Sequence, residues 1–397
     1  MGAELPFGVE YQPADSGPFL WQAFNLATVV SDMGAIAAAG FRVIRLGLAW
    51  DSFMPDAQGV DRRRLREFDL VLTAARELGL RLIPVLFIQA HGDCVLLPSR
   101  SVRRDGARRG VRVLSQGFIE PGGPRDPWTD TLMLELADRW SAVMAAEFSG
   151  HPALAAWDLG QDPARVARPR RIADLGAWAA LAGGPMRERG DTVQITLGVD
   201  DVLVARGVRL SALAAHVDRI DLAVRPAPLR RLGLAEASAY CFVAELAQRL
   251  VGEPAVPIGL LVASPSPGDD AEGGEEVAAA GAIDELIQRR VEAGIAGLHA
   301  SRWRDLGPRL GERPPYDRFP WLLRTGLLGL DGAAKPSLRP WSHAAREDAE
   351  LPPPSAWPPH LDVESYYANL PESLLDLASG WHREQDDHPG ILDSGDA

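Results

Sequence analysis

The sequence has few cysteines, no long apolar run and no surplus of positive charge. Only Cys94 and Cys241 occur among 397 residues, and their spacing is not that of a disulfide framework or a zinc site. We therefore expect two buried thiols, no metal and no cofactor. No run of about 18 apolar residues predicts a membrane span, and Met1 to Gln12 lacks a basic stretch followed by an apolar one, so we expect a soluble, cytoplasmic protein.

The balance of charge disfavours one class of partner. The formal net charge is -13, whereas proteins that bind the phosphate backbone draw on clustered Lys and Arg. Hydrophobic residues make up 46% of the chain and charged residues 24%, which is ordinary for a globular protein with a large core. The composition thus predicts a folded protein that does not bind nucleic acid, and it leaves any protein partner open.

Short apolar runs alternate with longer amphipathic stretches, a pattern that builds parallel sheets from βαβ units. Helical spacing is clear at Asp61 to Leu78, Thr131 to Phe148, Glu236 to Val251 and Glu275 to Ala293. Eight predicted strands favour a closed (β/α)8 TIM barrel over an open sheet. The strands are expected near Phe7 to Tyr11, Arg42 to Leu48, Arg81 to Ile88, Ala153 to Leu159, Val193 to Leu197, Ile220 to Val224, Val256 to Val262 and Gly297 to Ala300.

Two segments are too long or too irregular for ordinary connections. Ile88 to Thr129 is predicted to be an elaborated loop at the catalytic face of the barrel, and the acidic, Gly-rich Ser264 to Glu276 a flexible insertion there. We expect one barrel domain over residues 1–347. Residues 348–397, Pro-rich and then acidic, are expected to form a partly docked tail.

Several strings in order along the chain resemble the family 5 glycoside hydrolases. They cover most of Phe7 to Tyr367, and they imply a clan A barrel of the cellulase or mannanase type that takes a carbohydrate ligand. The most specific string is His151 to Gly160. The others are Gly8 to Tyr11 (GVEY), Gly40 to Arg45 (GFRVIR), Trp50 to Phe53 (WDSF), His91-Gly92, Pro315 to Asp317 (PYD) and Gly326 to Gly332 (GLLGLDG).

The positions that carry chemistry in that family have changed here. Retaining glycosidases need two carboxyl groups about 5 to 5.5 Å apart. At the fourth strand the family's Asn-Glu-Pro reads Gln161-Asp162-Pro163, which leaves Asp162 as a weak acid/base candidate. At the seventh strand Val262 is expected where the family has its nucleophile, and valine has no nucleophilic chemistry. Arg225-Pro226-Ala227 replaces His-Pro-Tyr at the sixth strand, and Ser301 replaces a tryptophan at the eighth.

Six residues are candidates for sugar contacts: Arg45, Trp50, His91, Trp128, Gln161 and Arg225. His91 is a candidate by its motif context, and Trp50 and Trp128 are candidate aromatic platforms for a sugar ring. For Asp162, a turn role before proline is an equal alternative. Arg225 and Arg302 suit an anionic ligand such as a uronate or phosphate, although salt bridges to Asp221 or Asp305 are the simpler interpretation. Asp158 is expected to be a structural partner of a backbone amide or an arginine.

Three functions remain open. A pseudo-glycosidase with a carbohydrate-binding or regulatory role follows from a retained scaffold that lacks its nucleophile. An active β-glycosidase would pair Asp162 with a displaced carboxylate, for which Glu10, Asp51 and Asp305 are the candidates, in an inverting arrangement. A non-enzymatic scaffold would present barrel loops to a partner. Fold alone does not choose among these, because this barrel hosts many functions.

Overall fold

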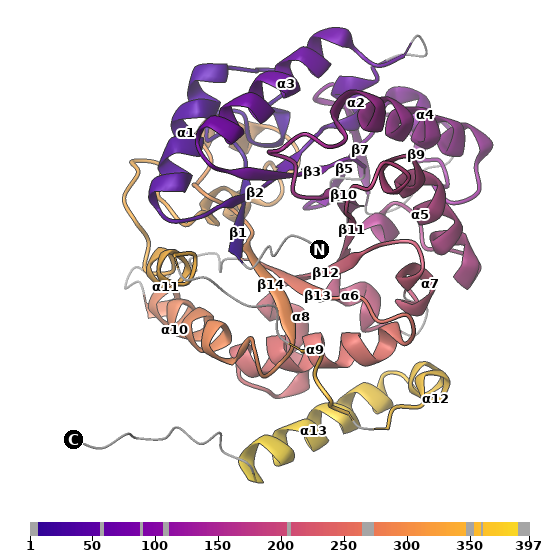
Figure 1. Ribbon diagram of the computed structural model, residues 1–397, viewed down its shortest axis with the longest axis vertical. Coiled ribbons are helices and arrows are strands. Elements are labelled where there is room, and N and C mark those ends of the chain that lie inside the picture. Colours follow the sequence, from indigo (N-terminus) through magenta and orange to yellow (C-terminus); the bar gives the residue numbers. More distant parts are fainter. Residues whose placement is uncertain are drawn as a thin grey trace.

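The computed structural model describes residues 7–55, 59–87, 90–105, 111–204, 208–263, 274–346, 353–358 and 360–387. Within them, eight parallel strands close into a barrel in which each strand follows its predecessor around the ring (Figure 1). The predicted (β/α)8 fold is confirmed, with all eight strands near their expected places. They are β1 Phe7–Tyr11, β2 Val43–Gly47, β3 Arg81–Val85, β10 Trp157–Gln161, β11 Val193–Gly198, β12 Arg219–Val224, β13 Ile258–Val262 and β14 Ile295–Ala300.

Helices form the outer ring around these strands (Figure 1). Polar residues cap several of them, as at α4, where the Asp130 carboxylate accepts from the N–H groups of Leu132 and Met133, which stabilises the first turn. The apolar faces of the ring pack on the barrel in one large core. The longer helices are α1 Leu26–Ala38, α3 Arg62–Glu77, α4 Thr131–Phe148, α5 Ile172–Arg187, α9 Glu236–Val251 and α10 Gly274–Arg289, and α11 Leu338–Ala344 closes the ring.

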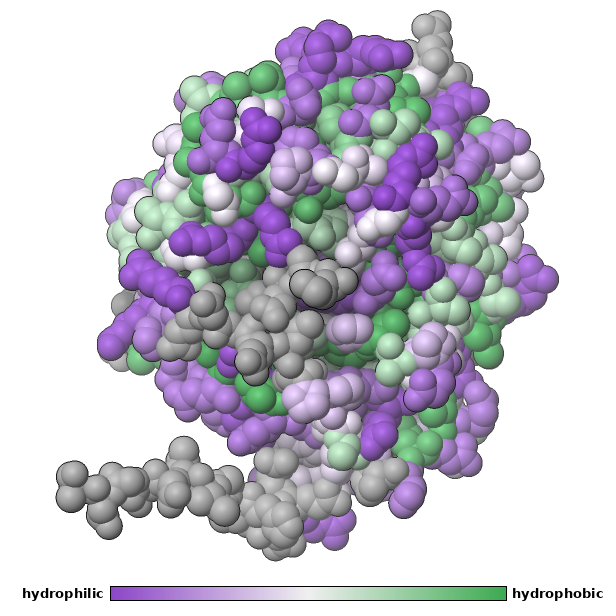
Figure 2. Space-filling view, viewed as in Figure 1, coloured by the Kyte–Doolittle hydropathy of each residue, from purple (hydrophilic) through white to green (hydrophobic). Residues whose placement is uncertain are grey.

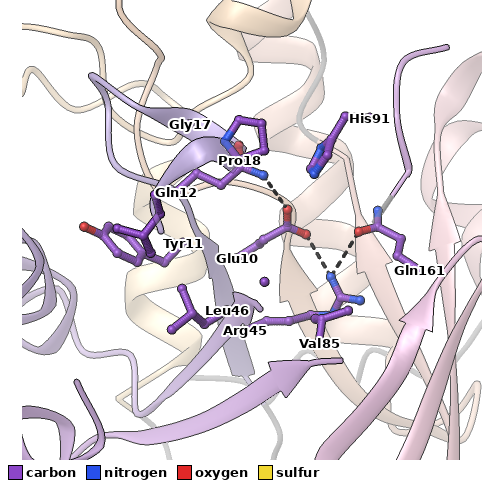
Figure 3. A pocket seen from close by; sticks show the side chains of 12 residues that line it. Glu10, Tyr11, Gln12, Gly17, Pro18, Arg45, Leu46, Val85, His91 and Gln161 are labelled. Atoms are coloured by element: carbon purple, nitrogen blue, oxygen red, sulfur yellow. Dashed lines mark hydrogen bonds and ion pairs between the residues drawn. The ribbon is translucent and has the colours of Figure 1, made fainter. Parts of the chain in front are cut away.

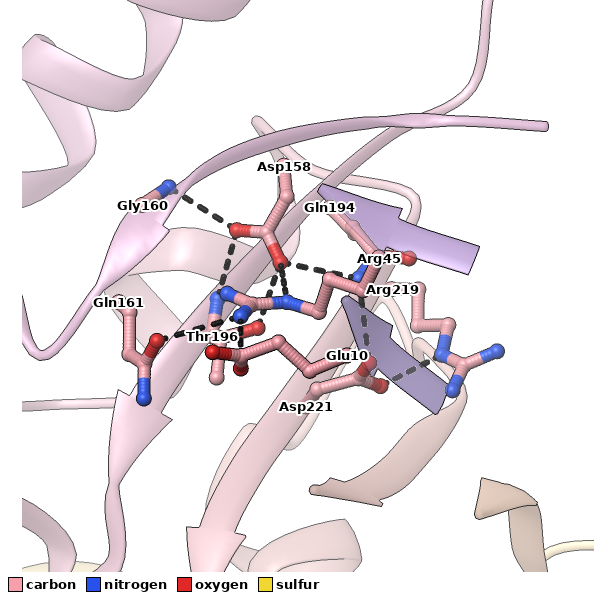
Figure 4. Close-up of polar contacts among 9 residues, drawn as sticks. All are labelled: Glu10, Arg45, Asp158, Gly160, Gln161, Gln194, Thr196, Arg219 and Asp221. Atoms are coloured by element: carbon pink, nitrogen blue, oxygen red, sulfur yellow. Dashed lines mark hydrogen bonds and ion pairs between the residues drawn. The ribbon is translucent and has the colours of Figure 1, made fainter. Parts of the chain in front are cut away.

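One layer inside the barrel is polar, whereas most such barrels are filled with branched apolar side chains. Arg45, 1% exposed, donates from Nε to Asp158 Oδ2 at 3.1 Å. Asp158, as expected for a structural residue, also accepts from Thr196 Oγ1 at 2.6 Å and from the Gly160 N–H at 2.9 Å (Figure 4). Gln194 bridges Asp158 to Asp221. The layer is therefore a connected hydrogen-bond network that ties β2, β10, β11 and β12 together.

The segment after β3 carries strands of its own. A four-stranded sheet is formed by β4 Ala90–His91, β5 Cys94–Leu96, β7 Arg112–Ser115 and β8 Phe118–Glu120, beside a pair of β6 Val102–Arg103 and β9 Gly123–Pro124. The insertion follows the carboxyl end of β3. It therefore lies on the predicted face, at the carboxyl ends of the barrel strands. Residues 88–89 and 106–110 lie outside the described residues.

The chain beyond the barrel adds two helices, α12 Val363–Ala368 and α13 Glu372–Asp387, drawn in yellow outside α9 in Figure 1. Trp381 of α13 is 1% exposed and meets Phe242 of α9 with ring centroids 6.1 Å apart. The C-terminal residues thus dock on the helical ring as far as they are described. The domain boundary expected at residue 348 and most of the acidic insertion, residues 264–273, lie outside the described residues.

The surface carries no unusual apolar feature on the face seen in Figure 2, where hydrophilic side chains cover most of the outer helices and hydrophobic patches are small and separate. No helix among the described residues has the length and apolar character needed to cross a membrane. Cys94 and Cys241 are both buried free thiols, as predicted.

Candidate functional site

A pocket opens at the carboxyl ends of the barrel strands, the face on which barrel enzymes place their active sites. Its volume of about 100 Å³ is enough for several water-sized groups. Residues from the ends of β1, β10, β12, β13 and β14 line it, together with the insertion and the segment after β14. The lining includes Glu10, His91, Gln161, Asp162, Arg165, Arg225, Leu261, Ala263, Arg302, Tyr316 and Trp321.

Arg45 and Glu10 form the floor of this region. Arg45 Nη1 donates to Glu10 Oε2 at 3.0 Å and to Gln161 Oε1 at 3.2 Å, and Figure 3 shows these side chains around a smaller cavity of about 20 Å³ beside His91. Burial raises the pKa of Glu10, and the charge of Arg45 opposes that rise. Arg45 therefore acts from below, by orienting Glu10 and Gln161 toward the pocket.

His91 reaches the pocket from β4 of the insertion (Figure 3). Burial lowers the pKa of His91 to about 3, and the positive charges of Arg302 and Arg45 add to that shift. The ring is consequently neutral at pH 7 and offers one donor and one acceptor nitrogen. This is a hydrogen-bonding group suited to a hydroxyl.

Asp162 starts a turn and also lines the pocket. Its backbone is left-handed, with φ 52° and ψ 51°, a conformation that Asp tolerates better than most residues, and it starts the turn Pro163–Arg165. Its carboxylate is buried against Gly198, where an added Cβ would clash with it. Arg225 Nη2 lies 3.6 Å from Asp162 Oδ2, while Oδ1 has no hydrogen-bond partner among the described residues. Burial raises the Asp162 pKa, with Arg225 opposing.

Strand register decides which residues of the seventh strand face the pocket. Gly259 pairs with Asp221 inside the barrel, and Leu261 pairs with Ala223; side chains two apart share a face. Leu261 and Ala263 accordingly line the pocket, whereas Val262 is part of the hydrophobic core. Val262, which was expected at the nucleophile position, therefore does not line the pocket, and neither Leu261 nor Ala263 carries a carboxylate.

Comparisons with known proteins show which solved structures share this architecture. No protein-family model matches the sequence, and no curated protein does. The structure is similar to GH5_18 from Streptomyces cattleya, solved with GlcNAc (TM-score 0.72, 19% identity, 89% of this chain and 83% of that one). GH5_18 from Bifidobacterium longum subsp. infantis gives a TM-score of 0.72 at 19% identity over 89% and 80% of the two chains.

The exo-beta-1,4-mannosidase Op5Man5 from Opitutaceae bacterium strain TAV5 is also similar, with a TM-score of 0.70 and 19% identity over 86% of this chain. The chain spans 59% of the length of Op5Man5. The fold is that of the family 5 glycoside hydrolases. The resemblance seen in the sequence motifs is thus matched in three dimensions.

Two aromatic residues of this family 5-like barrel do not lie where we expected them. Trp50 is 3% exposed and packs edge-on against Phe87 at 5.2 Å. Trp128 is 4% exposed, and its Nε1 donates to the Ala167 carbonyl at 2.7 Å. Both are core residues and offer no face to a sugar, which corrects their assignment as platforms.

The aromatic side chains that do line the pocket were missed. Tyr316 has a buried hydroxyl with no hydrogen-bond partner among the described residues. Trp321, in η6 Pro320–Arg324, is 44% exposed. Both lie after β14, where no periodic pattern marks them. The only signal was the PYD string itself, followed by a tryptophan directly after a proline.

The ion-pair partners predicted for Arg225 and Arg302 also differ from those in the structure. Arg219 Nε donates to Asp221 at 2.6 Å, and Lys335 Nζ donates to Asp305 at 2.8 Å. Neither carboxylate is thus the ion-pair partner of Arg225, which pairs with Asp162. Arg302 makes no ion pair with any described residue. Asp305 also accepts from the Gly326 N–H, so it has a structural role and does not line the pocket.

Asp51, the other candidate for a displaced carboxylate, holds the insertion in place. It is fully buried, accepts from the Gln116 N–H at 2.6 Å, and does not line the pocket. Burial raises the pKa of Asp51 to about 6. Among the described residues, no group of His, Cys, Asp and Glu side chains has the arrangement of a metal site.

Replacing Asp51 with alanine should destabilise the protein by about 0.5–1.5 kcal/mol at pH 5, because the hydrogen bond from the Gln116 N–H is lost. The measurement is urea denaturation at pH 5, below the raised pKa of about 6, where the buried carboxyl group is neutral in the folded protein and its ionisation does not oppose folding. Asp105→Ala is the matched control, since that carboxylate is exposed and pairs with the exposed Arg103. An unchanged unfolding midpoint for Asp51→Ala would show that the hydrogen bond between Asp51 and Gln116 contributes nothing to stability.

Proposed function

We propose that this chain is a carbohydrate-binding barrel that does not hydrolyse glycosides by the retaining mechanism of its structural relatives. The single observation that carries the proposal is the end of β13, where Leu261 and Ala263 face the pocket. A retaining mechanism needs a second carboxylate there to form the glycosyl-enzyme intermediate. Leucine and alanine supply neither a nucleophile nor a base.

The rest of the pocket supports binding. Gln161, neutral His91 and the Tyr316 hydroxyl present hydrogen-bond donors and acceptors, and Trp321 presents an exposed ring. Polar groups that converge in a concave site fix the orientation of a ligand. The open pocket also disfavours the scaffold alternative, because a barrel that only presents loops to a partner needs no pocket.

An inverting hydrolase is the second candidate, because one observation favours it. Glu10 and Asp162 both line the pocket, and burial raises the pKa of each, as it does for many general acids. An inverting pair needs a general base to activate water. Glu10 is paired with Arg45 at 3.0 Å, and a carboxylate whose oxygen already accepts from a guanidinium is a weaker base toward water, which disfavours this role.

Binding is tested by isothermal titration with a panel of β-mannosides and β-glucosides that includes Manβ1-4GlcNAc, the ligand in one GH5_18 structure. The expected result is saturable binding, abolished by Trp321→Ala and retained in Phe118→Ala, a control with a more exposed aromatic ring outside the pocket. Product analysis of the same mixtures should show intact ligand. Absence of binding across the panel would overturn the carbohydrate assignment, and released sugar would overturn the non-hydrolytic one.

A further inference from the structure

Positive charge is concentrated in the pocket of an otherwise acidic chain. The net charge of the whole chain is -13, yet the pocket lining carries three guanidinium groups against two carboxylates. One of those carboxylates, Glu10, is already occupied by Arg45 below it. The three guanidinium groups belong to Arg165, Arg225 and Arg302.

Arg302 is the residue that most strongly indicates an anion-binding site. It is 6% exposed, so its charge is almost fully removed from water, and it makes no ion pair with any described residue. Its Nη1 donates to the Leu322 carbonyl, whereas its Nε has no partner in the part of the chain that is described. A buried cation is costly unless an anion or hydrogen bonds compensate it.

The other two arginines are placed to act with it. Arg165 donates to the Gly92 carbonyl and makes no ion pair within the described residues. Arg225 has only the 3.6 Å contact to Asp162 and is 38% exposed, so it retains donors for a ligand. Burial is the main cause of the low pKa of the neighbouring His91, and the positive charges of Arg302, Arg45 and Arg165 lower that pKa further. Arginine forks match carboxylate and phosphate groups in a bidentate manner.

We infer that the pocket selects an acidic sugar, a pyranose bearing a carboxylate or phosphate group that Arg225 and Arg302 bind while the ring contacts Trp321. This inference rests on the proposed carbohydrate binding and narrows it to a ligand class. The exposed ring of Trp321 lines the pocket together with both arginines, so one pyranose can reach all three. Glu10 compensates part of the charge of Arg302, and an anionic group in the pocket adds to that compensation.

The test is isothermal titration of the full-length protein with methyl β-glucuronide, methyl β-glucoside, glucose 6-phosphate and inorganic phosphate. We expect an acidic sugar to bind about tenfold or more tightly than the neutral glucoside, the size of one charge-assisted hydrogen bond. Its affinity should fall with added salt. Preference for the glucuronide assigns a carboxylate, and preference for the sugar phosphate assigns a phosphate; either supports the inference.

Variants identify the residues responsible. Arg225→Ala should weaken binding of the acidic sugar about tenfold and leave the neutral glucoside within about twofold. Arg189→Ala, which removes an exposed arginine outside the pocket, should change neither. Arg302 is buried, so the binding result for Arg302→Gln is interpreted only if this variant unfolds at the same temperature as the parent protein. If Arg302→Gln is destabilised, the test depends on Arg225→Ala alone.

Three outcomes would overturn the inference. Equal affinity for glucuronide and glucoside would remove the acidic selectivity while the proposed carbohydrate binding stands. Inorganic phosphate that binds as tightly as glucose 6-phosphate would show an anion site with no part for the sugar ring. No binding of any probe, with none of the neutral oligosaccharides bound either, would end both proposals.

Discussion

Replacing Arg45 with methionine should destabilise the protein by about 3–5 kcal/mol, because breaking a buried ion pair leaves uncompensated charge. Arg45 is 1% exposed and lies 3.0 Å from Glu10 and 3.1 Å from Asp158. Methionine preserves much of the length of the side chain but offers no donor. Both carboxylates would then stay buried without their cation. The measurement is the free energy of unfolding from urea denaturation at pH 7.

Arg62→Met is the matched control for that experiment. Arg62 is 81% exposed and lies 3.8 Å from Glu147, and ion pairs of this kind contribute little in water. Its midpoint should stay near that of the parent protein. Equal, small effects of the two substitutions would show that the polar layer inside the barrel is not what stabilises this fold.

Asp201→Asn should stabilise the protein by about 2–4 kcal/mol at pH 8, and the gain should shrink toward zero near pH 4. Asp201, in α6 Val199–Val202, is 7% exposed. Burial, with a contribution from the charge of Asp162, raises the Asp201 pKa to about 7. In the unfolded chain its pKa returns to about 3.9. Folded protein therefore binds the proton more tightly, and stability falls as pH rises from about 4 to about 7.

Thermal unfolding across pH 4 to 8 checks this sign. Asp200→Asn is the control, since Asp200 is the exposed neighbour on the same short helix and acts on Asp201 only through its charge. It should give a small stabilisation of the same direction. A gain from Asp201→Asn that is the same at pH 4 and pH 8 would contradict the assignment, because only a titrating carboxylate makes the gain depend on pH.

The fold was predictable because its signals are local. The alternation of apolar runs with amphipathic helices can be seen directly in the sequence. Eight such strand-and-helix units are compatible with few topologies. Among the motif residues, Glu10 of β1 and His91 of β4 line the pocket, whereas Arg45 of β2 lies below it. The fourth strand begins later than expected, at Trp157, because residues 153–156 are used for a turn and a single bridge between Leu82 and Leu154.

The site was predictable only in part, since it depends on facts that no local pattern encodes. A one-residue shift in register exchanges the two faces of a strand, and this is why Val262 was placed in the pocket instead of Leu261 and Ala263. Whether a tryptophan is buried depends on distant segments, such as Ala167 for Trp128. Tyr316 and Trp321 belong to an irregular segment whose path is set by tertiary contacts.

The central claim is tested most directly by one assay of hydrolysis with 4-nitrophenyl β-mannoside and β-glucoside. The parent protein, Asp162→Asn and Glu10→Gln are compared at equal concentration with a blank without protein. We expect all three to release nitrophenol at the rate of the blank, because the pocket has no carboxylate at the end of β13. Turnover by the parent protein that either substitution abolishes would contradict the account and establish Asp162 with Glu10 as an active pair.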